Sequence, residues 1–198
     1  MKLLASQHID KRKWDQMVAS DEQLDFFSLS WVQDMLHKEW EMLCDEDGNY
    51  LLNIPKGSKF GFSYRLQPFF IRSLHVSSKH KGDLKELVQF LKASASYVQL
   101  NVDSENQEVF QSFGKFQLLD LSIDLEGIKS KYATNAKRIL KKIPTEFILG
   151  ESTDVSEFIS FFRKQKGEEL RGFTPAVWQR LTNVLEETQR RGMLRIRT

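Results

Sequence analysis

The sequence predicts an α+β fold in which helices cover a mixed β-sheet, because it contains segments of two different periodicities. Around the turn signal Asp47-Gly48, segments 40–44 and 49–54 have the composition of two strands joined by a hairpin. From Phe60 to Gln67 apolar and polar residues alternate, which predicts a further strand. Other segments repeat apolar residues every three or four positions, as amphipathic helices do. The chain has 198 residues, of which 40% are hydrophobic, and this is enough for a core.

Capping residues indicate where the helices begin. Helix starts are expected at Asp10, Ser30, Asp83, Asp154 and Thr174. Ser30 has Gln33 at the spacing of a capping box, and Pro175 after Thr174 suits a first helical position. Further strands are expected at 97–103, 116–124, 146–149 and from 193 onward.

The segment 128–143 separates charge from apolar residues at a helical period, so we expect one amphipathic helix there. Lys129 to Lys142 holds six Lys or Arg and no Asp or Glu, in a chain whose formal net charge is only +2. The positive field is therefore local. The basic face is either a solvated helix surface or an anion-binding surface for phosphates, and the sequence leaves both open.

Three segments carry a family resemblance. "YATNAKRILKKI" from Tyr132, "KFGFSYRLQPFF" from Lys59 and "FFRKQKGEELRGF" from Phe161 resemble Fem-type transferases, relatives within the Gcn5-related N-acyltransferase superfamily. The resemblance implies a mixed, mostly antiparallel sheet flanked by helices. It also implies an acyltransferase-like half at 1–125, followed at 126–198 by a connecting basic helix and the opening elements of a second half.

By the same resemblance, the parent protein transfers an acyl or aminoacyl group from coenzyme A or aminoacyl-tRNA to an amine. Acyltransferases of this superfamily hold the cofactor's pyrophosphate on a loop of type Gln/Arg-x-x-Gly-x-Gly/Ala. No two glycines here are two positions apart, and "QRRGML" from Gln189 lacks the required small residue. We therefore expect a truncated, substrate-side portion of the enzyme that binds no cofactor and is inactive by itself. Whether this chain is an enzyme stays open.

The candidate substrate-binding residues lie on the strand and on the basic helix. They are Lys59, Tyr64, Arg65, Gln67, Asn135, Lys137, Arg138 and Lys141. Alternation places Arg65 and Gln67 on one face of the strand, and the resemblance places that strand beside the helix. There they would bind a phosphate or carboxylate of a small-molecule or peptide amine acceptor, unless Arg65 is an exposed strand residue paired with a neighbouring acid. Because Arg65 is expected at the surface, its removal should barely change stability.

Two non-enzymatic interpretations compete with this one. The basic helix 129–142 would make the chain a binding module for nucleic acid, including tRNA, or for an acidic partner. The alternating aromatics Phe60, Phe62 and Tyr64 would stack bases, although such residues are more commonly core.

Other classes of site find little support in the sequence. The four histidines are scattered, so no metal site is expected, and with Cys44 as the only cysteine no internal disulfide is possible. No segment approaches the roughly 18 apolar residues of a membrane span, and the N-terminal segment lacks signal-peptide features. We expect a cytoplasmic protein without a membrane span.

Overall fold

The computed structural model describes residues 1–79, 84–103, 123–142, 150–166, 169–170 and 172–197. The chain forms two compact units. One joins Met1–Val109 with Asp154–Leu194, and the other joins Phe110–Thr153 with Arg195–Thr198. The α+β class predicted from the sequence is confirmed. The division differs from the expected boundary near residue 125, because the helices after residue 154 belong to the unit that contains the N-terminus.

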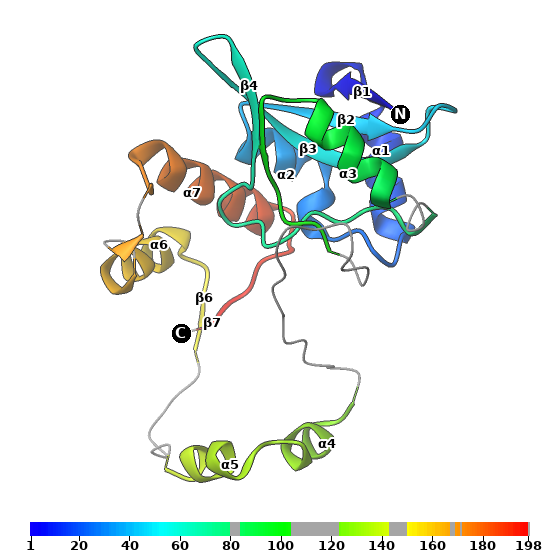
Figure 1. Cartoon of the computed structure of the whole chain (residues 1–198). Coiled ribbons are helices and arrows are strands. Elements are labelled where there is room, and N and C mark those ends of the chain that lie inside the picture. The colour runs from blue at the N-terminus through cyan, green and yellow to red at the C-terminus, as the bar shows by residue number, and fades with distance from the viewer. Residues whose placement is uncertain (80–83, 104–122, 143–149, 167–168, 171, 198) are drawn as a thin grey trace. The chain divides into compact units, whose positions relative to one another are not determined.

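The first unit is built on a five-stranded sheet (Figure 1). In their order across the sheet the strands are β1 (Lys2–Ala5), β2 (Glu39–Cys44), β3 (Tyr50–Lys59), β4 (Phe62–Leu66) and β5 (Tyr97–Gln99). Neighbouring strands are antiparallel except β4 and β5, which are parallel. A parallel pair needs a crossover connection, and this connection contains helix α3 (Leu84–Ala93).

Tight turns join the three central strands. Gly48, in the turn predicted at Asp47-Gly48, has φ +85°. Between β3 and β4 the turn residues Phe60 and Gly61 have φ 52° and 81°, and two positive values are the mark of a type I′ hairpin turn. The strand predicted from Phe60 is confirmed, and it pairs with the preceding strand.

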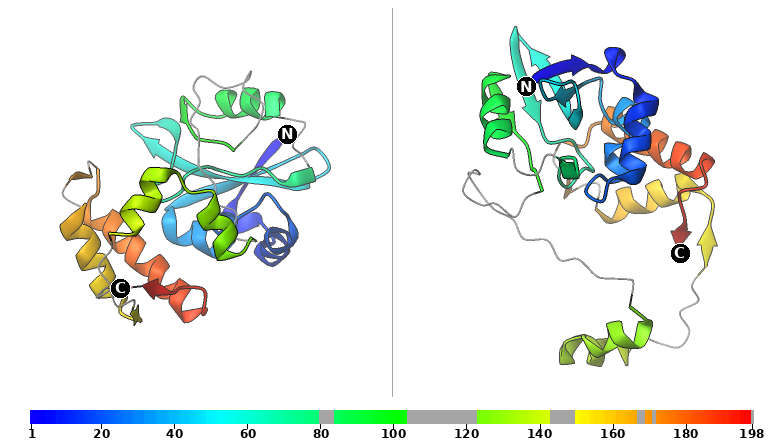
Figure 2. Two further views of the ribbon diagram at one scale, coloured as in Figure 1. Left: turned by 90° about the horizontal axis from the view of Figure 1, so that it is seen from below. Right: turned by 90° about the vertical axis from the view of Figure 1, so that its right-hand side faces the viewer.

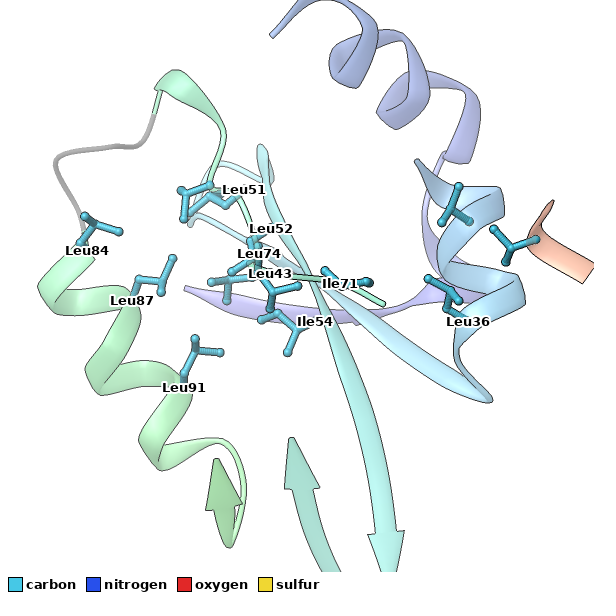
Figure 3. Close-up of a cluster of buried hydrophobic side chains, with 13 residues drawn as sticks. Leu36, Leu43, Leu51, Leu52, Ile54, Ile71, Leu74, Leu84, Leu87 and Leu91 are labelled. Atoms are coloured by element: carbon cyan, nitrogen blue, oxygen red, sulfur yellow. The ribbon is translucent and has the colours of Figure 1, made fainter. Parts of the chain in front are cut away.

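Helices cover both faces of the sheet (Figure 2). Helix α3 lies on one face, while α1 (Lys11–Ser20) and α2 (Ser30–Leu36) lie on the other. The apolar side of α3 consists of Leu84, Leu87 and Leu91, which are buried and point toward the strands in Figure 3. A second cluster surrounds Trp14 of α1 and Trp40 of β2. The sheet is therefore a central layer with a core on each side.

Two helices from the C-terminal part of the chain complete the first unit. They are α6 (Val155–Gln165) and α7 (Pro175–Arg190). Helix α7 packs against α2, and its Val184 belongs to the same core cluster as the residues of α2 and α3. The Arg191 guanidinium lies 4.4 Å from the ring centroid of Trp31. Phe162 joins α6 to α7 through Trp178, at 5.6 Å between ring centroids.

Three of the predicted helix caps are confirmed. The side chain of Asp10 accepts a hydrogen bond from the third residue of α1, Asp154 caps α6 in the same way, and Thr174 caps α7 with Pro175 at the first helical position. Asp83 lies outside the described residues.

The capping box at Ser30 is a wrong prediction. Leu29 is the N-cap of α2, and it makes no side-chain cap. The backbone amide and the hydroxyl of Ser30 instead donate to the Asp15 carboxylate of α1, at 2.7 and 2.8 Å. A carboxylate from a neighbouring helix thus takes the place of the local cap, and local spacing alone does not predict that exchange.

The second unit contains short elements. They are α4 (Leu125–Ser130), α5 (Thr134–Leu140) and the antiparallel pair of β6 (Glu151–Ser152) and β7 (Ile196–Arg197). The single helix predicted for 128–143 is wrong, since the chain leaves the helical conformation between α4 and α5 and is extended at Ala133. The Lys137 ammonium donates to the carbonyl of Ser130 at 3.0 Å, which satisfies the free end of α4. The strand expected at 146–149 lies outside the described residues. Of the strand expected at 116–124, residues 123 and 124 are described, and Asp124 is the N-cap of α4 instead.

Candidate functional site

A pocket of about 590 Å³ lies within the first unit, beside the C-terminal end of β4. Its walls come from three parts of the chain. Residues 36–39 at the end of α2 form one wall, β3 to β5 contribute the floor, and Val177 and Arg180 of α7 close it together with residues 67–70.

Gln67 shapes the pocket by joining the ends of the two parallel strands. Its backbone amide donates to the Gln99 carbonyl at 2.7 Å, and its side-chain oxygen accepts from the Asn101 amide at 2.8 Å. The side-chain nitrogen of Gln67 donates to the Ile71 carbonyl at 2.7 Å. The next residue, Pro68, has no amide proton, so it cannot extend the ladder. The side chain of Gln67 therefore replaces strand pairing where the chain turns away from the sheet.

An aromatic rim follows this turn. Phe69 and Phe70 line the pocket, and Phe173 contacts both of them, with ring centroids 5.0 and 5.3 Å away. Phe173 in turn contacts Trp178 of α7 at 5.0 Å. Packing of aromatic rings against one another thus fixes the rim to the helix that carries Arg180.

Tyr64 forms part of the floor, and Gly57 of β3 makes room for its ring. A Cβ atom at Gly57 would overlap the Tyr64 ring. The two residues face each other in the antiparallel register of β3 and β4. The glycine therefore lets an aromatic ring lie flat against the backbone of β3 at the pocket floor.

His37 and Arg180 determine the charge at the α2 wall. Burial, together with a smaller contribution from the Arg180 charge, lowers the pKa of His37 to about 4, so the imidazole is neutral at pH 7. His37 Nε2 is buried and makes no hydrogen bond to a described residue. Arg180 contacts the Leu36 carbonyl at 3.5 Å and is otherwise exposed.

The described residues of the lining carry a net positive charge. Among them, Lys38, Lys56 and Arg180 face one acid, Glu39. Lys56 also pairs with Glu41 at 2.9 Å, so Lys38 and Arg180 carry most of the charge that a ligand would meet. An aromatic rim with cations on one wall fits a small molecule that has an apolar part and an anionic group.

Of the eight residues predicted from the sequence, the structure brings Tyr64 and Gln67 together in this pocket. Lys59 lies at the end of β3, with its ammonium 5.4 Å from the ring centroid of Phe60. Arg65 lies on the opposite face of β4 from Tyr64, because successive side chains of a strand point to opposite faces.

Arg65 is buried, so its predicted surface location is wrong. The residue is 3% exposed, and its guanidinium donates to Glu41 at 2.7 Å, to the Ser94 hydroxyl at 2.9 Å and to the Pro55 carbonyl at 3.3 Å. Burial alone would raise the pKa of Glu41, but hydrogen bonds from Arg65 and Lys56 outweigh it and lower the pKa. The predicted alternation of side chains along β4 is confirmed, but the face that carries Arg65, which was expected to be exposed, is the buried one.

The remaining candidates, Asn135, Lys137, Arg138 and Lys141, lie in or directly after α5 of the second unit. All four are exposed, and Asn135 accepts a hydrogen bond from the Arg138 guanidinium at 3.1 Å. Their predicted proximity to the strand concerns the arrangement of two units and stays a prediction.

Sequence reasoning missed His37 and Arg180 as members of a site. They are separated by more than 140 positions, and they meet only because α7 packs on α2. Neither residue belongs to a recognisable motif, so no local signal marks them.

Other reactive groups contribute little. Burial raises the pKa of the Cys44 thiol, which makes it a poor nucleophile. Across the described ranges, no cluster of three His, Cys, Asp or Glu side chains is placed to hold a metal ion. No helix in the part of the chain that the structure describes is both long and apolar enough to span a membrane.

Comparison of the chain with models of protein families, with curated proteins and with solved structures gives no match in any of the three. The pocket between β4, α2 and α7 is therefore interpreted from its own chemistry.

Proposed function

We propose that this chain is the substrate-binding portion of an N-acyltransferase or aminoacyltransferase, and that its pocket holds the amine acceptor. The main support for the proposal is the identity of the segments that form the pocket walls. Two of the segments that resemble Fem-type transferases meet there: residues 59–70 supply Tyr64, Gln67 and the Phe69–Phe70 rim, and residues 161–173 supply Phe173, which holds that rim.

The charges of the lining support an acceptor with an anionic group. Arg180 and Lys38 lie at the pocket without an acidic partner among the described residues, and a guanidinium binds carboxylate and phosphate oxygens in two parallel hydrogen bonds. Phe69, Phe70 and Tyr64 offer apolar surface for the rest of the molecule. The neutral state of His37 at pH 7 avoids adding a further positive charge that would repel the ammonium of an amine.

The proposal assigns the acceptor, and not the acyl donor, to this chain. A donor such as coenzyme A needs backbone amides around its pyrophosphate, and the sequence has no pair of glycines two positions apart to form the usual cradle. Gln67 and Pro68 instead occupy the end of β4, where the Gln67 side chain forms hydrogen bonds with the backbone of Ile71 and Asn101.

Binding of simple amines tests the proposal. We expect that glycine, L-glutamate or phosphoethanolamine, each with an amine and an anionic group, shifts the NMR signals of the Gln67 and Gln99 side-chain amides in a saturable way. Arg180→Ala should abolish the shifts. Lys164→Ala removes an exposed cation of α6 outside the pocket and should leave them unchanged. Equal shifts in both variants, or none with any of the three amines, would refute the proposed acceptor site.

A second candidate function is that of a polyanion-binding module. The observation that favours it is the exposure of all five basic residues at and around α5, namely Lys131, Lys137, Arg138, Lys141 and Lys142. This surface belongs to the second unit, so either function is testable without the other.

A further inference from the structure

We propose that the hairpin surface, defined as Lys59, Phe60, Phe62, Leu66 and Tyr97, binds single-stranded nucleic acid by stacking bases on its aromatic rings. The proposal does not depend on the function of the pocket. It starts from the finding that the aromatic residues of this hairpin, expected to be core, are in contact with water.

The exposure of these rings is large. Phe60 is 89% exposed, Phe62 67% and Tyr97 56%. The end of the hairpin extends beyond the neighbouring strand, since the pairing of β2 with β3 stops at Lys56 (Figure 1). A globular protein normally buries rings of this size, and a group of exposed ones indicates an interaction site.

The sheet arranges the side chains on one face. Phe62, Tyr64 and Leu66 alternate along β4, and Tyr97 of β5 is in parallel register with Tyr64. Alternate residues of a strand lie about 7 Å apart and adjacent strands about 5 Å apart. These separations allow neighbouring rings to take the bases of successive nucleotides, as sheet-based single-strand binders do.

The turn residue Phe60 strengthens the inference. Its φ of 52° lies in the left-handed region, where asparagine or glycine is the usual choice in a type I′ turn. A phenylalanine at this position is conformationally unfavourable, and its ring gains no burial in return. Because the strained backbone of Phe60 is not compensated by burial of its ring, we infer that the ring functions in binding.

The positive charge near the hairpin surface indicates which kind of partner it binds. From Asn49 to Gly82 the chain contains no Asp or Glu, and Lys59 lies over the Phe60 ring with its ammonium 5.4 Å from the centroid. A polyanion is attracted to such a surface. A two-fold contact with a second copy would instead bring two positively charged hairpins together. Insertion into lipid would bury the polar pair formed by the Tyr97 hydroxyl and Gln99.

Fluorescence anisotropy of fluorescein-labelled oligothymidylate, measured with the whole chain, tests the proposal. We expect saturable binding that Phe60→Ala and Phe62→Ala each weaken about tenfold, because each removes one stacking partner. Phe161→Ala is the matched control, since Phe161 is 62% exposed on α6, outside the hairpin surface. Phe62→Tyr should retain binding and Phe62→Leu should lose it, which separates stacking from general apolar contact.

Two further arms separate the alternatives. Replacement of Lys137, Arg138 and Lys141 by Glu should leave the tenfold effects at the hairpin in place. If that replacement removes all binding while Phe60→Ala and Phe62→Ala change nothing, nucleic acid binds at α5 and the proposal fails. It also fails if the chain ignores the oligonucleotide but sediments with vesicles of phosphatidylcholine and phosphatidylserine, and loses that binding in the same two variants.

Discussion

At the scale of single residues, Arg65 has a structural role that its sequence context conceals. It connects β4 to Glu41 of β2 across the intervening strand, and its Nε donates to Ser94 just after α3. The side chains of Arg65 and Glu41 are largely buried, with exposures of 4% and 12%. Loss of one member of a buried ion pair leaves the other without compensation, which is more costly than loss of an exposed contact.

Replacement of Arg65 by Ala should therefore destabilise the fold by about 3 kcal/mol, and not by the few tenths expected of a surface position. Lys56 still pairs with Glu41 and limits the effect. Urea unfolding of Arg65→Ala measures the change, with Lys59→Ala of the exposed hairpin end as the control. A loss of less than about 1 kcal/mol would mean that solvent or Lys56 fully replaces the guanidinium.

The neutral state of His37 makes stability depend on pH. In the unfolded chain the imidazole titrates near 6.5, whereas burial and the Arg180 charge lower its folded pKa to about 4. Between these values the unfolded state binds a proton that the folded state does not, so stability falls as pH falls through this window and levels off below it. From pH 7 to pH 5 the loss should reach roughly 2 kcal/mol.

His37→Gln should remove that dependence, and His8→Gln, at an exposed position, should preserve it. Chemical unfolding at both pH values is sufficient to compare the three proteins. An identical slope in the wild type and in His37→Gln would show that the imidazole is not held neutral.

At the scale of secondary-structure elements, local signals predicted most of the boundaries. Asp10, Asp154 and Thr174 cap helices with their own side chains, and the Asp47-Gly48 turn depends on two adjacent residues. These features act over a few residues, so the sequence displays them directly. The prediction of one continuous helix over 128–143 is wrong because helical periodicity does not reveal local breaks in a helix. The chain becomes extended at Ala133, and the Lys137 ammonium donates to the Ser130 carbonyl at the end of α4.

The burial of β4 shows the limit of the same reasoning. Alternation gives the two faces of a strand without saying which one the rest of the protein covers. Here the face with Arg65 is the buried one, and Phe62 lies on the opposite face, where the hairpin extends beyond β2, so its ring is exposed. Part of the pocket could not be predicted from the sequence either, because His37 and Arg180 meet only through the packing of α7 on α2. Tyr64 and Gln67 could be predicted as candidates because they belong to one strand segment.

The basic residues around α5 allow a prediction for this element as a whole. If they bind polyanions, replacement of Lys137, Arg138 and Lys141 by Glu should abolish retention on heparin or transfer RNA. With three fewer phosphate contacts, the dependence of log affinity on log salt should flatten by about two to three units. Because all three side chains are exposed, the circular dichroism spectrum should stay unchanged. An unchanged salt slope would leave these residues as a solvated surface.

At the scale of the whole molecule, the first unit is continuous in space and not in sequence. Helices α6 and α7 follow Phe110–Thr153 of the second unit in the sequence but belong to the first unit, and α7 packs on α2 and supplies one wall of the pocket. Pocket formation is therefore coupled to a contact between distant parts of the chain.

A consequence for the whole chain concerns the acyl donor. Without a glycine pair for a pyrophosphate cradle, the chain should not bind coenzyme A or acetyl-coenzyme A appreciably. Titration calorimetry at millimolar cofactor should give no saturable heat. A micromolar dissociation constant would show that another surface holds the donor, and it would overturn the assignment of the acceptor alone to this chain.

The central claim is that the pocket beside β4 receives an amine acceptor through its anionic group. A crystal soaked with phosphoethanolamine tests it most directly. We predict density for the phosphate within hydrogen-bonding distance of the Arg180 guanidinium, with the remainder of the molecule against the Phe69–Phe70 rim, and none at that position in Arg180→Ala. Density elsewhere on the molecule, with the pocket filled only by water, would contradict the account.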